Sequence, residues 1–149
     1  MGLLSDLGQG PVALDSSIFI YFIEEHPLFL PVVEPVFASI AARDVAAVTS
    51  SLTLLEVLVR PLRANLRELA TEYEQILTRS SEITLIPLDL AVLRLAARLR
   101  ATRGLKTPDA LHLAAALESG SSVFLTNDDR IPQVKGLRVI RARDYLEPG

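Results

Sequence analysis

The 149-residue chain contains no cysteine, which excludes disulfide bonds and metal sites built from thiolates. It has no uninterrupted apolar run near the ~18 residues that a membrane-spanning helix needs. Its first residues lack the basic start and the long apolar segment of a secretory signal. From these absences we expect a cytoplasmic protein that has no part in a membrane.

An excess of positive charge is also missing, because the formal net charge is −3 at pH 7. The protein is therefore not a general binder of polyanions. Lysine is scarce among the 15 basic residues, since only Lys106 and Lys135 are lysines and the other 13 are arginines. Arginine contacts phosphate through a planar fork of donors, so a local phosphate-binding surface remains compatible with the acidic total.

The residues that are present are those of a globular protein. Half of the chain is hydrophobic and 22% is charged, which is typical of a soluble domain with an apolar core. A single domain of this length can bury a substantial core. No repeat, low-complexity tract or interdomain linker divides the sequence. We expect a loose lead-in over residues 1–11 and one domain over residues 12–146.

Short apolar runs alternate along the chain with longer helical patterns. The short runs predict strands at 12–14, 45–49, 83–86, 122–125 and 137–140. The helical patterns cover 18–23, 30–42, 52 to a break at Pro61, 66–78, 90–102 and 107–117. Such alternation is typical of a parallel sheet with helices on both faces. We therefore expect an α/β fold of three layers, α/β/α, around a central parallel sheet of four to five strands.

The helix predicted over residues 107–117 has a marked start. Thr107 is suited to be its N-cap, and Pro108 fits the first helical position, where the missing N–H costs nothing. Asp109 lies in the first turn, at the positive end of the helix dipole. The rest of the helix is small and apolar, so it can be buried on nearly all sides. Asp109 is then a carboxylate at the mouth of a buried helix.

Three further acids follow strands or begin helices. Asp15 ends the first predicted strand, Asp128 follows the fourth, and Glu56 begins the helix after the second. Taken alone, Asp15 can cap a helix, Asp128 can close an Asx turn, and Asp109 can complement the helix dipole. In parallel sheets, however, the carboxyl ends of the strands lie along one edge, where ligands bind. We therefore expect all four acids to meet at that edge.

Glu56 has two interpretations that the sequence leaves open. It shares a helical face with Leu52, Leu55 and Val59, where a charged group is costly unless it is paired or binds a metal. It also stands three residues after Thr53, the spacing of a capping box.

Crowded carboxylates repel one another and raise one another's pKa, and a divalent cation removes this penalty. Oxygen ligands favour Mg²⁺ or Mn²⁺. We expect Asp15, Glu56 and Asp109 to bind the metal, directly or through water, and Asp128 to hold a second ion or orient the attacking water. For hydrolysis of a phosphodiester, a metal held in this way can lower the pKa of a bound water and neutralise charge on the phosphate. The residues alone thus indicate a divalent-cation site at the edge of the sheet.

Four segments resemble the acidic motifs of the PIN-domain ribonucleases, in the same order and spacing. They are Leu14-Asp15-Ser16-Ser17, Ser51 to Val57, Thr107 to Ala114, and Leu125-Thr126-Asn127-Asp128. The likeness is strongest to the toxins of VapBC-type toxin–antitoxin pairs, and it extends over about Val12 to Tyr145. It implies a PIN-like fold and a metal-dependent endoribonuclease that acts on single-stranded or looped RNA, is inhibited by a partner antitoxin, and is usually a homodimer.

The resemblance leaves some roles open between neighbouring residues. Asp129 adjoins Asp128 and can take its place as the fourth acid. A serine, threonine or asparagine near the family's site maps onto one of Ser16, Ser17, Thr126 and Asn127. His112 lies one turn after Asp109, where we expect it to pack behind the metal ligands rather than act as a general acid or base.

RNA needs cations beside the acidic edge, and two lie close in the sequence. Arg103 and Lys106 flank the short loop before the helix that begins at Thr107, so we expect them to contact the RNA backbone. Arg60 and Arg63 offer a different path.

Other functional classes fit the residues less well. A haloacid-dehalogenase-like phosphatase needs a second acid two residues after Asp15, where Ser17 stands. A receiver domain needs an acidic pair beside the first strand and a late lysine, for which Lys135 is poorly placed. An RNA-processing PIN-like nuclease outside a toxin–antitoxin pair, and a non-catalytic protein-docking module of the same fold, remain alternatives.

Overall fold

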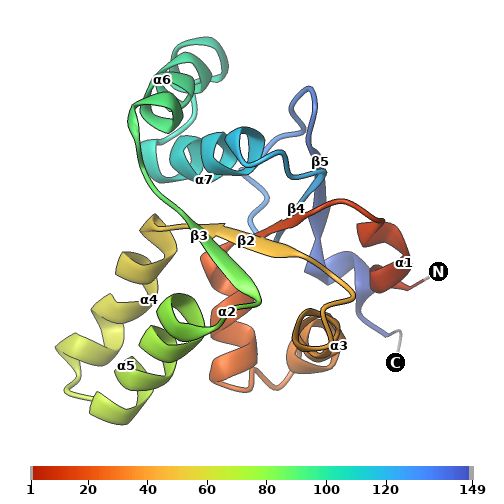
Figure 1. The fold of residues 1–149 in the computed structure, drawn as a ribbon, viewed down its shortest axis with the longest axis vertical. Coiled ribbons are helices and arrows are strands. Elements are labelled where there is room, and N and C mark those ends of the chain that lie inside the picture. Colours follow the sequence, from red (N-terminus) through yellow and green to blue (C-terminus); the bar gives the residue numbers. More distant parts are fainter. Residues whose placement is uncertain (1, 148–149) are drawn as a thin grey trace.

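The computed structural model describes residues 2–147, which contain one sheet of five strands (Figure 1). The strands are β1 (Val12–Leu14), β2 (Ala47–Ser50), β3 (Ile83–Ile86), β4 (Val123–Thr126) and β5 (Arg138–Arg141). They lie in the order β3-β2-β1-β4-β5, and every neighbouring pair is parallel. The prediction of a parallel sheet is therefore confirmed, with β1 at its centre.

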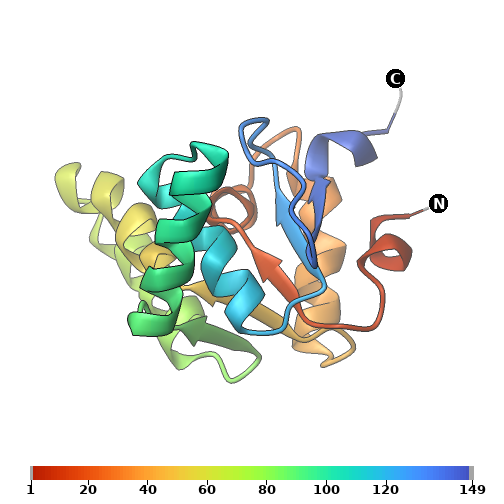
Figure 2. The same cartoon turned by 90° about the horizontal axis from the view of Figure 1, so that it is seen from above.

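Helices cover both faces of this sheet. They are α1 (Leu3–Leu7), α2 (Ser16–Ile23), α3 (Leu30–Ala41), α4 (Leu52–Arg63), α5 (Arg67–Glu74), α6 (Leu90–Arg103) and α7 (Thr107–Glu118). A π-helical turn, η1 (Gln75–Arg79), continues α5, and a 3₁₀ turn, η2 (Ala142–Tyr145), follows β5. Figure 2 shows α7 and α6 on one side of the strands and α3 on the other. None of these helices within residues 2–147 is long and apolar enough to cross a membrane.

The core consists of two apolar clusters, one on each face of the sheet. Because successive side chains of a strand point to opposite faces, Val12 and Leu14 of β1 lie in one cluster and Ala13 lies in the other. The cluster around Ala13 includes α7, whose alanines, such as Ala110 and Ala114, are fully buried. This arrangement confirms the three-layer α/β/α fold.

The first eleven residues differ from the expected loose lead-in. Leu3–Leu7 form α1, and both Leu3 and Leu7 are buried in the same cluster as α3. The hydroxyl of Tyr145 donates to the Asp6 carboxylate, which joins α1 to the C-terminal turn η2. The short helix is stabilised by packing that a local pattern of five residues does not reveal.

Pro61 does not end α4, contrary to the prediction. The helix continues to Arg63 because Pro61 is buried on the same face as Thr53 and Val57. A proline removes one helical hydrogen bond, and this packing offsets the loss. The face of α4 that carries Leu52, Leu55 and Val59 was expected to pack on the core. This expectation is wrong, since Leu55 is 60% exposed and therefore faces solvent.

Helix boundaries near the site follow the sequence more closely. The side chain of Asp89 accepts a hydrogen bond from the Val92 N–H at 3.0 Å and caps α6, which begins at Leu90 as predicted. Gly104 ends the helix in the left-handed conformation, with φ of 66°. The N-cap of α7 is Lys106, however, so that Thr107 is the first helical residue and not the cap. Strands β2, β4 and β5 begin one or two residues later than predicted.

Candidate active site

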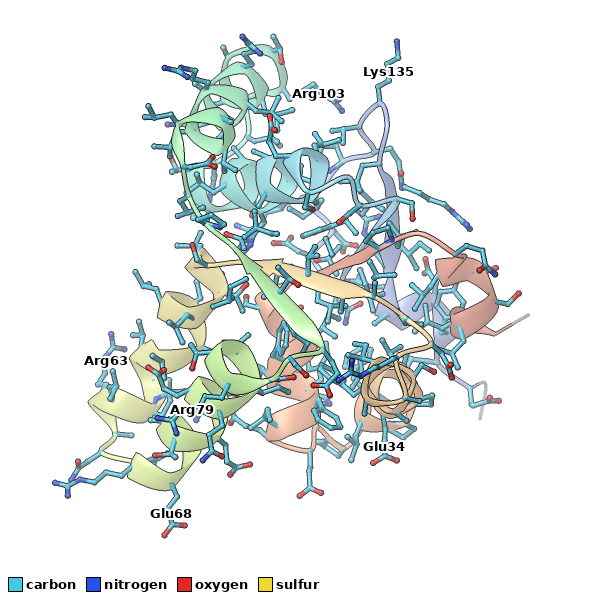
Figure 3. The ribbon with its side chains drawn as sticks, viewed as in Figure 1. Glu34, Arg63, Glu68, Arg79, Arg103 and Lys135 are labelled. Carbon is cyan, nitrogen blue, oxygen red and sulfur yellow. The ribbon has the colours of Figure 1, made fainter. Side chains whose placement is uncertain are left out.

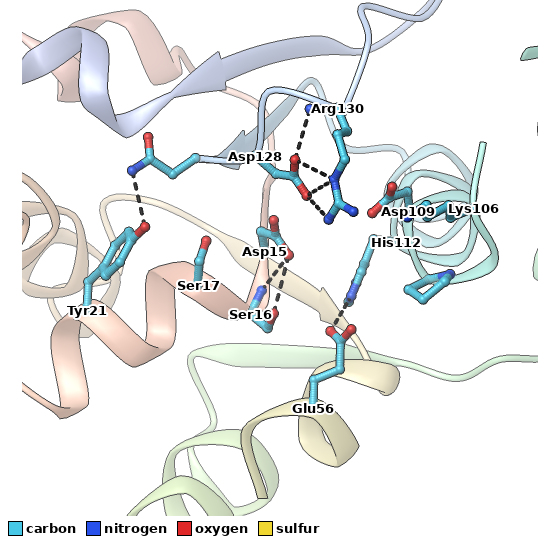
Figure 4. A pocket seen from close by; sticks show the side chains of 12 residues that line it. Asp15, Ser16, Ser17, Tyr21, Glu56, Lys106, Asp109, His112, Asp128 and Arg130 are labelled. Carbon is cyan, nitrogen blue, oxygen red and sulfur yellow. Dashed lines mark hydrogen bonds and ion pairs between the residues drawn. The ribbon is translucent and has the colours of Figure 1, made fainter. Parts of the chain in front are cut away.

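A pocket of about 400 Å³ opens at the carboxyl edge of the sheet, beside the ends of β1 and β4 and the starts of α2 and α7 (Figure 4). Its lining includes all four acids that the sequence predicts to converge, namely Asp15, Glu56, Asp109 and Asp128. The expected convergence follows from the topology, because β1, β2 and β4 are parallel neighbours and end at the same edge.

Asp15 is held in place by the first turn of α2 and by β4. Its Oδ1 atom accepts a hydrogen bond from the Ser16 N–H at 2.8 Å, so it is the N-cap of α2. Its Oδ2 atom accepts from the Thr126 hydroxyl at 2.5 Å. Thr126 is completely buried and its hydroxyl also accepts from the Asp128 N–H at 3.0 Å. One hydroxyl group thus ties two of the acidic segments together.

Glu56 faces the pocket and contacts His112. Its Oε1 atom lies 2.6 Å from Nε2 of His112, which links α4 to α7. Thr53 lies inside α4, where its hydroxyl bonds to that of Thr49, and the N-cap residue Ser51 makes no side-chain capping bond, so the capping-box interpretation is wrong. Burial works to raise the pKa of Glu56, but the hydrogen bond and positive charge of His112 together bring it below the ordinary value.

His112 is buried beneath the pocket, with a side chain only 4% exposed. Burial disfavours its charged form, but the hydrogen bond to Glu56 and the nearby charges of Asp15 and Asp109 outweigh this and raise the pKa of His112. Its Nδ1 atom is buried and has no hydrogen-bond partner among residues 2–147. The imidazole therefore contacts the acidic cluster through one nitrogen only.

The negative charge of Asp109 is disfavoured by its surroundings. Burial raises the pKa of Asp109, the charge of Asp128 adds to that effect, and the opposing charge of Arg130 does not cancel it. The carboxylate lies in the first turn of α7, where the helix dipole stabilises a negative charge. An ionised group in this position gains from any cation that enters the pocket.

Asp128, and not its neighbour Asp129, faces the pocket. The guanidinium of Arg130 contacts both Asp128 oxygens, with Nη2 2.7 Å from Oδ2, and its hydrogen bond holds the pKa of Asp128 below the ordinary value. Asp129 is directed to Arg141 and Arg143 instead.

The small polar residues of the two motifs surround these acids. Ser16 contacts Asp15 through its backbone N–H, and Ser17 lines the pocket with a buried hydroxyl that has no partner among residues 2–147. Asn127 donates to the hydroxyl of Tyr21 at 3.1 Å and accepts from the backbone N–H of Arg143 in η2. Of the four candidates, Thr126 has the most direct contact with an acid.

The two predicted RNA-contacting residues are placed differently. Lys106 lines the pocket. Arg103 does not, because its guanidinium donates to the backbone carbonyl of Gln133 at 3.1 Å. Figure 3 shows Arg103 at the end of α6 and Arg63 on the separate α4–α5 arm, so the two alternative RNA paths run over different elements.

Sequence reasoning missed two residues that line the pocket, Tyr21 and Arg130. Tyr21 lies in the middle of α2, and a tyrosine inside an apolar helix is typical of a core residue. Arg130 is two residues after Asp128, and this spacing alone is typical of an exposed ion pair in a turn. Only the fold of the loop after β4 places its guanidinium beside Asp109, as Figure 4 shows.

The donor set fits a divalent cation. One ligand atom each from Asp15, Glu56 and His112 can be chosen so that all lie within 4.8 Å of one another. Asp109 lies in the same pocket, where burial and then the charge of Asp128 raise its pKa, so a bound cation would favour its ionised form. Oxygen atoms dominate this set, which suits Mg²⁺ or Mn²⁺, and one imidazole nitrogen is compatible with Mn²⁺.

Comparisons with known proteins agree with this geometry. The family model described as PIN domain matches residues 12–137. A search of the curated proteins found no match.

Solved structures with a similar fold include three toxin–antitoxin complexes. VapBC2 from Rickettsia felis, bound to a DNA fragment from its promoter, has a TM-score of 0.67 at 18% identity and covers 88% of this chain and 98% of its own. DNA-bound VapBC from Salmonella typhimurium has a TM-score of 0.64 at 21% identity, covering 89% and 98%. VapBC-5 from Mycobacterium tuberculosis has a TM-score of 0.56 at 24% identity, also covering 89% and 98%. At these identities the likeness shows a shared fold.

Proposed function

The chain belongs to the PIN domain family, and on this premise we propose that it is a metal-dependent endoribonuclease that serves as the toxin of a type II toxin–antitoxin pair. The observation that supports this most directly is the meeting of Asp15, Glu56, Asp109 and Asp128 in one pocket at the carboxyl edge of the sheet. Four acids around a pocket of this size suit a divalent cation and the phosphate of a polynucleotide better than they suit a neutral substrate.

Asp15, Glu56 and Asp109 are the residues that would hold Mg²⁺ or Mn²⁺. When bound, such an ion lowers the pKa of a water and offsets the charge of the phosphodiester. The protein's own contribution is orientation. The Thr126 hydroxyl and the Ser16 N–H each fix one oxygen of Asp15, and His112 fixes one oxygen of Glu56. Partners of this kind keep ligand side chains in place before an ion arrives.

The antitoxin and a second copy of the chain are the proposed protein partners, with cytoplasmic RNA as the substrate. The solved structures named above contain VapBC pairs, which supports the first partner. Apolar side chains are also exposed on α4 and α6, where Leu55, Leu62 and Leu90 are 60%, 65% and 64% exposed. Leu55 and Leu62 are seven positions apart on α4, about two helical turns, and we propose the exposed face that they share as the one a protein partner covers.

Incubation of the purified chain with single-stranded RNA, with and without Mn²⁺, tests the nuclease. We expect cleavage only with the metal, and a loss of several orders of magnitude in Asp15→Asn, which keeps the shape of the side chain and removes its charge. Equal cleavage by Asp15→Asn and the unaltered chain would refute the site. A small DNA-binding protein encoded beside this chain, able to suppress the cleavage, would support the toxin role.

A further inference from the structure

Arg130 brings a positive charge into the acidic pocket. It follows β4 and folds back so that its Nε atom lies 3.0 Å from Oδ1 and 3.2 Å from Oδ2 of Asp128, while Nη2 lies 2.7 Å from Oδ2. The backbone N–H of Arg130 donates to the same carboxylate at 2.9 Å. Four contacts between two neighbouring residues give the guanidinium a defined orientation.

The rest of the guanidinium remains available. An arginine has five N–H donors, and the contacts with Asp128 engage only Nε and Nη2. Among residues 2–147, no hydrogen-bond acceptor contacts Nη1. Figure 4 shows the guanidinium between Asp128 and Asp109, on the pocket side of the loop, and its side chain is 61% exposed. Free donors thus face the space where a substrate would enter.

We propose that Arg130 binds the scissile phosphate of RNA and that Asp128 positions Arg130 instead of binding the metal. The inference rests on the proposed nuclease function. A phosphodiester brings a negative charge into a pocket lined by four carboxylates. The arginine and the lysine in the lining of this pocket are Arg130 and Lys106, and their charges offset that repulsion. A guanidinium presents paired donors that match phosphate oxygens, which an ammonium group does not.

The engagement of Asp128 explains why it differs from the other acids. Its two oxygens are occupied by Arg130, whereas the ligand atoms that lie close together come from Asp15, Glu56 and His112. A carboxylate that must orient a guanidinium is poorly suited to bind a cation as well, because the metal would compete with the arginine for the same oxygens. Metal binding and phosphate binding are therefore assigned to different acids of the pocket.

Arg130→Ala, Arg130→Lys and Asp128→Asn, made in the full chain, test this assignment. Arg43→Ala is the matched control, since Arg43 also pairs with an acid, Glu82, but lies at the opposite edge of the sheet. Mn²⁺ affinity is measured by calorimetry without RNA, and affinity for a short mixed-sequence RNA is measured in a salt series with Asp15→Asn added to block cleavage.

We expect Arg130→Ala to lower RNA affinity about tenfold and to reduce the slope of its salt dependence by about one phosphate contact. Mn²⁺ affinity should be unchanged or higher, because a cation has left the pocket. Asp128→Asn should lower RNA affinity less than Arg130→Ala does, because Arg130 keeps its charge but loses the carboxylate that orients it, and Mn²⁺ should still bind. Arg130→Lys should keep the salt slope but lose most of the affinity that Arg130 contributes, and Arg43→Ala should change neither quantity.

Wild-type RNA affinity in Arg130→Ala, or loss of Mn²⁺ binding in Asp128→Asn, would overturn the inference while leaving the nuclease intact. Failure of the unaltered chain to bind Mn²⁺ and to cleave RNA would instead overturn the proposed function, and the inference with it.

Discussion

Nε2 of His112 lies 2.6 Å from Oε1 of Glu56 and so joins α7 to α4 across the pocket. The contact shifts both groups toward their charged forms, since the pKa of His112 is raised and the pKa of Glu56 is lowered. Neither residue alone indicates this pair in the sequence, because 56 positions separate them. His112 thus stabilises the ionised form of Glu56 on one side of the pocket, whereas burial and the charge of Asp128 disfavour the ionised form of Asp109 on the other.

His112→Gln should destabilise the chain by about 1–3 kcal/mol near pH 5.5, because a buried charge-assisted hydrogen bond is lost. The stabilisation from a raised histidine pKa is complete below the ordinary value of 6.5 and is lost as pH rises through the folded pKa. The stabilisation from the lowered pKa of Glu56 is complete above its ordinary value of 4.5 and is lost as pH falls through the folded pKa. We therefore measure urea unfolding of His112→Gln and of the unaltered chain, both without metal. Their free energies of unfolding should differ most between pH 4.5 and pH 6.5.

A double-mutant cycle with Glu56→Gln separates the pair from general damage to the core. If the double variant is as unstable as the sum of the single variants at pH 5.5, the two side chains are not coupled and the pH argument is wrong.

Asp109→Asn should stabilise the metal-free chain at pH 7. The pKa of Asp109 is raised on folding by burial and by Asp128, so its ionised form is disfavoured in the folded state. This cost is present above the folded pKa and disappears as pH falls below the unfolded value. We expect a higher melting temperature for Asp109→Asn without metal, no further gain on adding Mn²⁺, and almost no RNA cleavage. A lower melting temperature without metal would mean that the helix-dipole interaction of Asp109 outweighs the repulsion.

The sheet and its acidic edge could be predicted because both depend on local patterns. Short apolar runs predict the strands, and parallel order alone then places Asp15 and Asp128 at one edge. The face of α4 could not be predicted in this way, since Leu55 and Val59 recur at helical spacing but are 60% and 41% exposed. A periodic pattern identifies an apolar face without saying which neighbour covers it.

Contacts between distant residues were the other source of error. The contact of His112 with Glu56, and the position of Arg130 beside Asp109, depend on how two loops and two helices meet. The short helix α1 escaped notice for the same reason, because its two buried leucines pack against residues far along the chain.

Leu7→Ala should destabilise the chain by about 2–4 kcal/mol, because Leu7 is fully buried and its loss leaves a cavity. Leu4 is 40% exposed on the same helix, so Leu4→Ala should change the free energy of unfolding by less than about 0.5 kcal/mol. Both values come from urea unfolding. Equal, small effects of the two substitutions would show that α1 does not belong to the folded core.

The placement of Lys106 and Arg103 leads to a last prediction about the RNA path. Lys106 lines the pocket, while Arg103 is directed to the backbone of Gln133 outside it. Lys106→Glu should therefore lower RNA affinity by about tenfold and flatten its salt dependence, since a phosphate contact is replaced by repulsion. Arg103→Glu should have a clearly smaller effect, although both substitutions change the net charge equally and lie three positions apart.

Arg63→Glu supplies the comparison for the other path, because Arg63 lies on the α4–α5 arm (Figure 3). The three variants are compared by fluorescence anisotropy with a labelled single-stranded RNA over a range of salt, in the Asp15→Asn background. If Arg63→Glu weakens binding more than Lys106→Glu does, the RNA enters along α4 and not beside the start of α7. Equal loss in all three would instead mean that the RNA responds to net charge and not to one local contact.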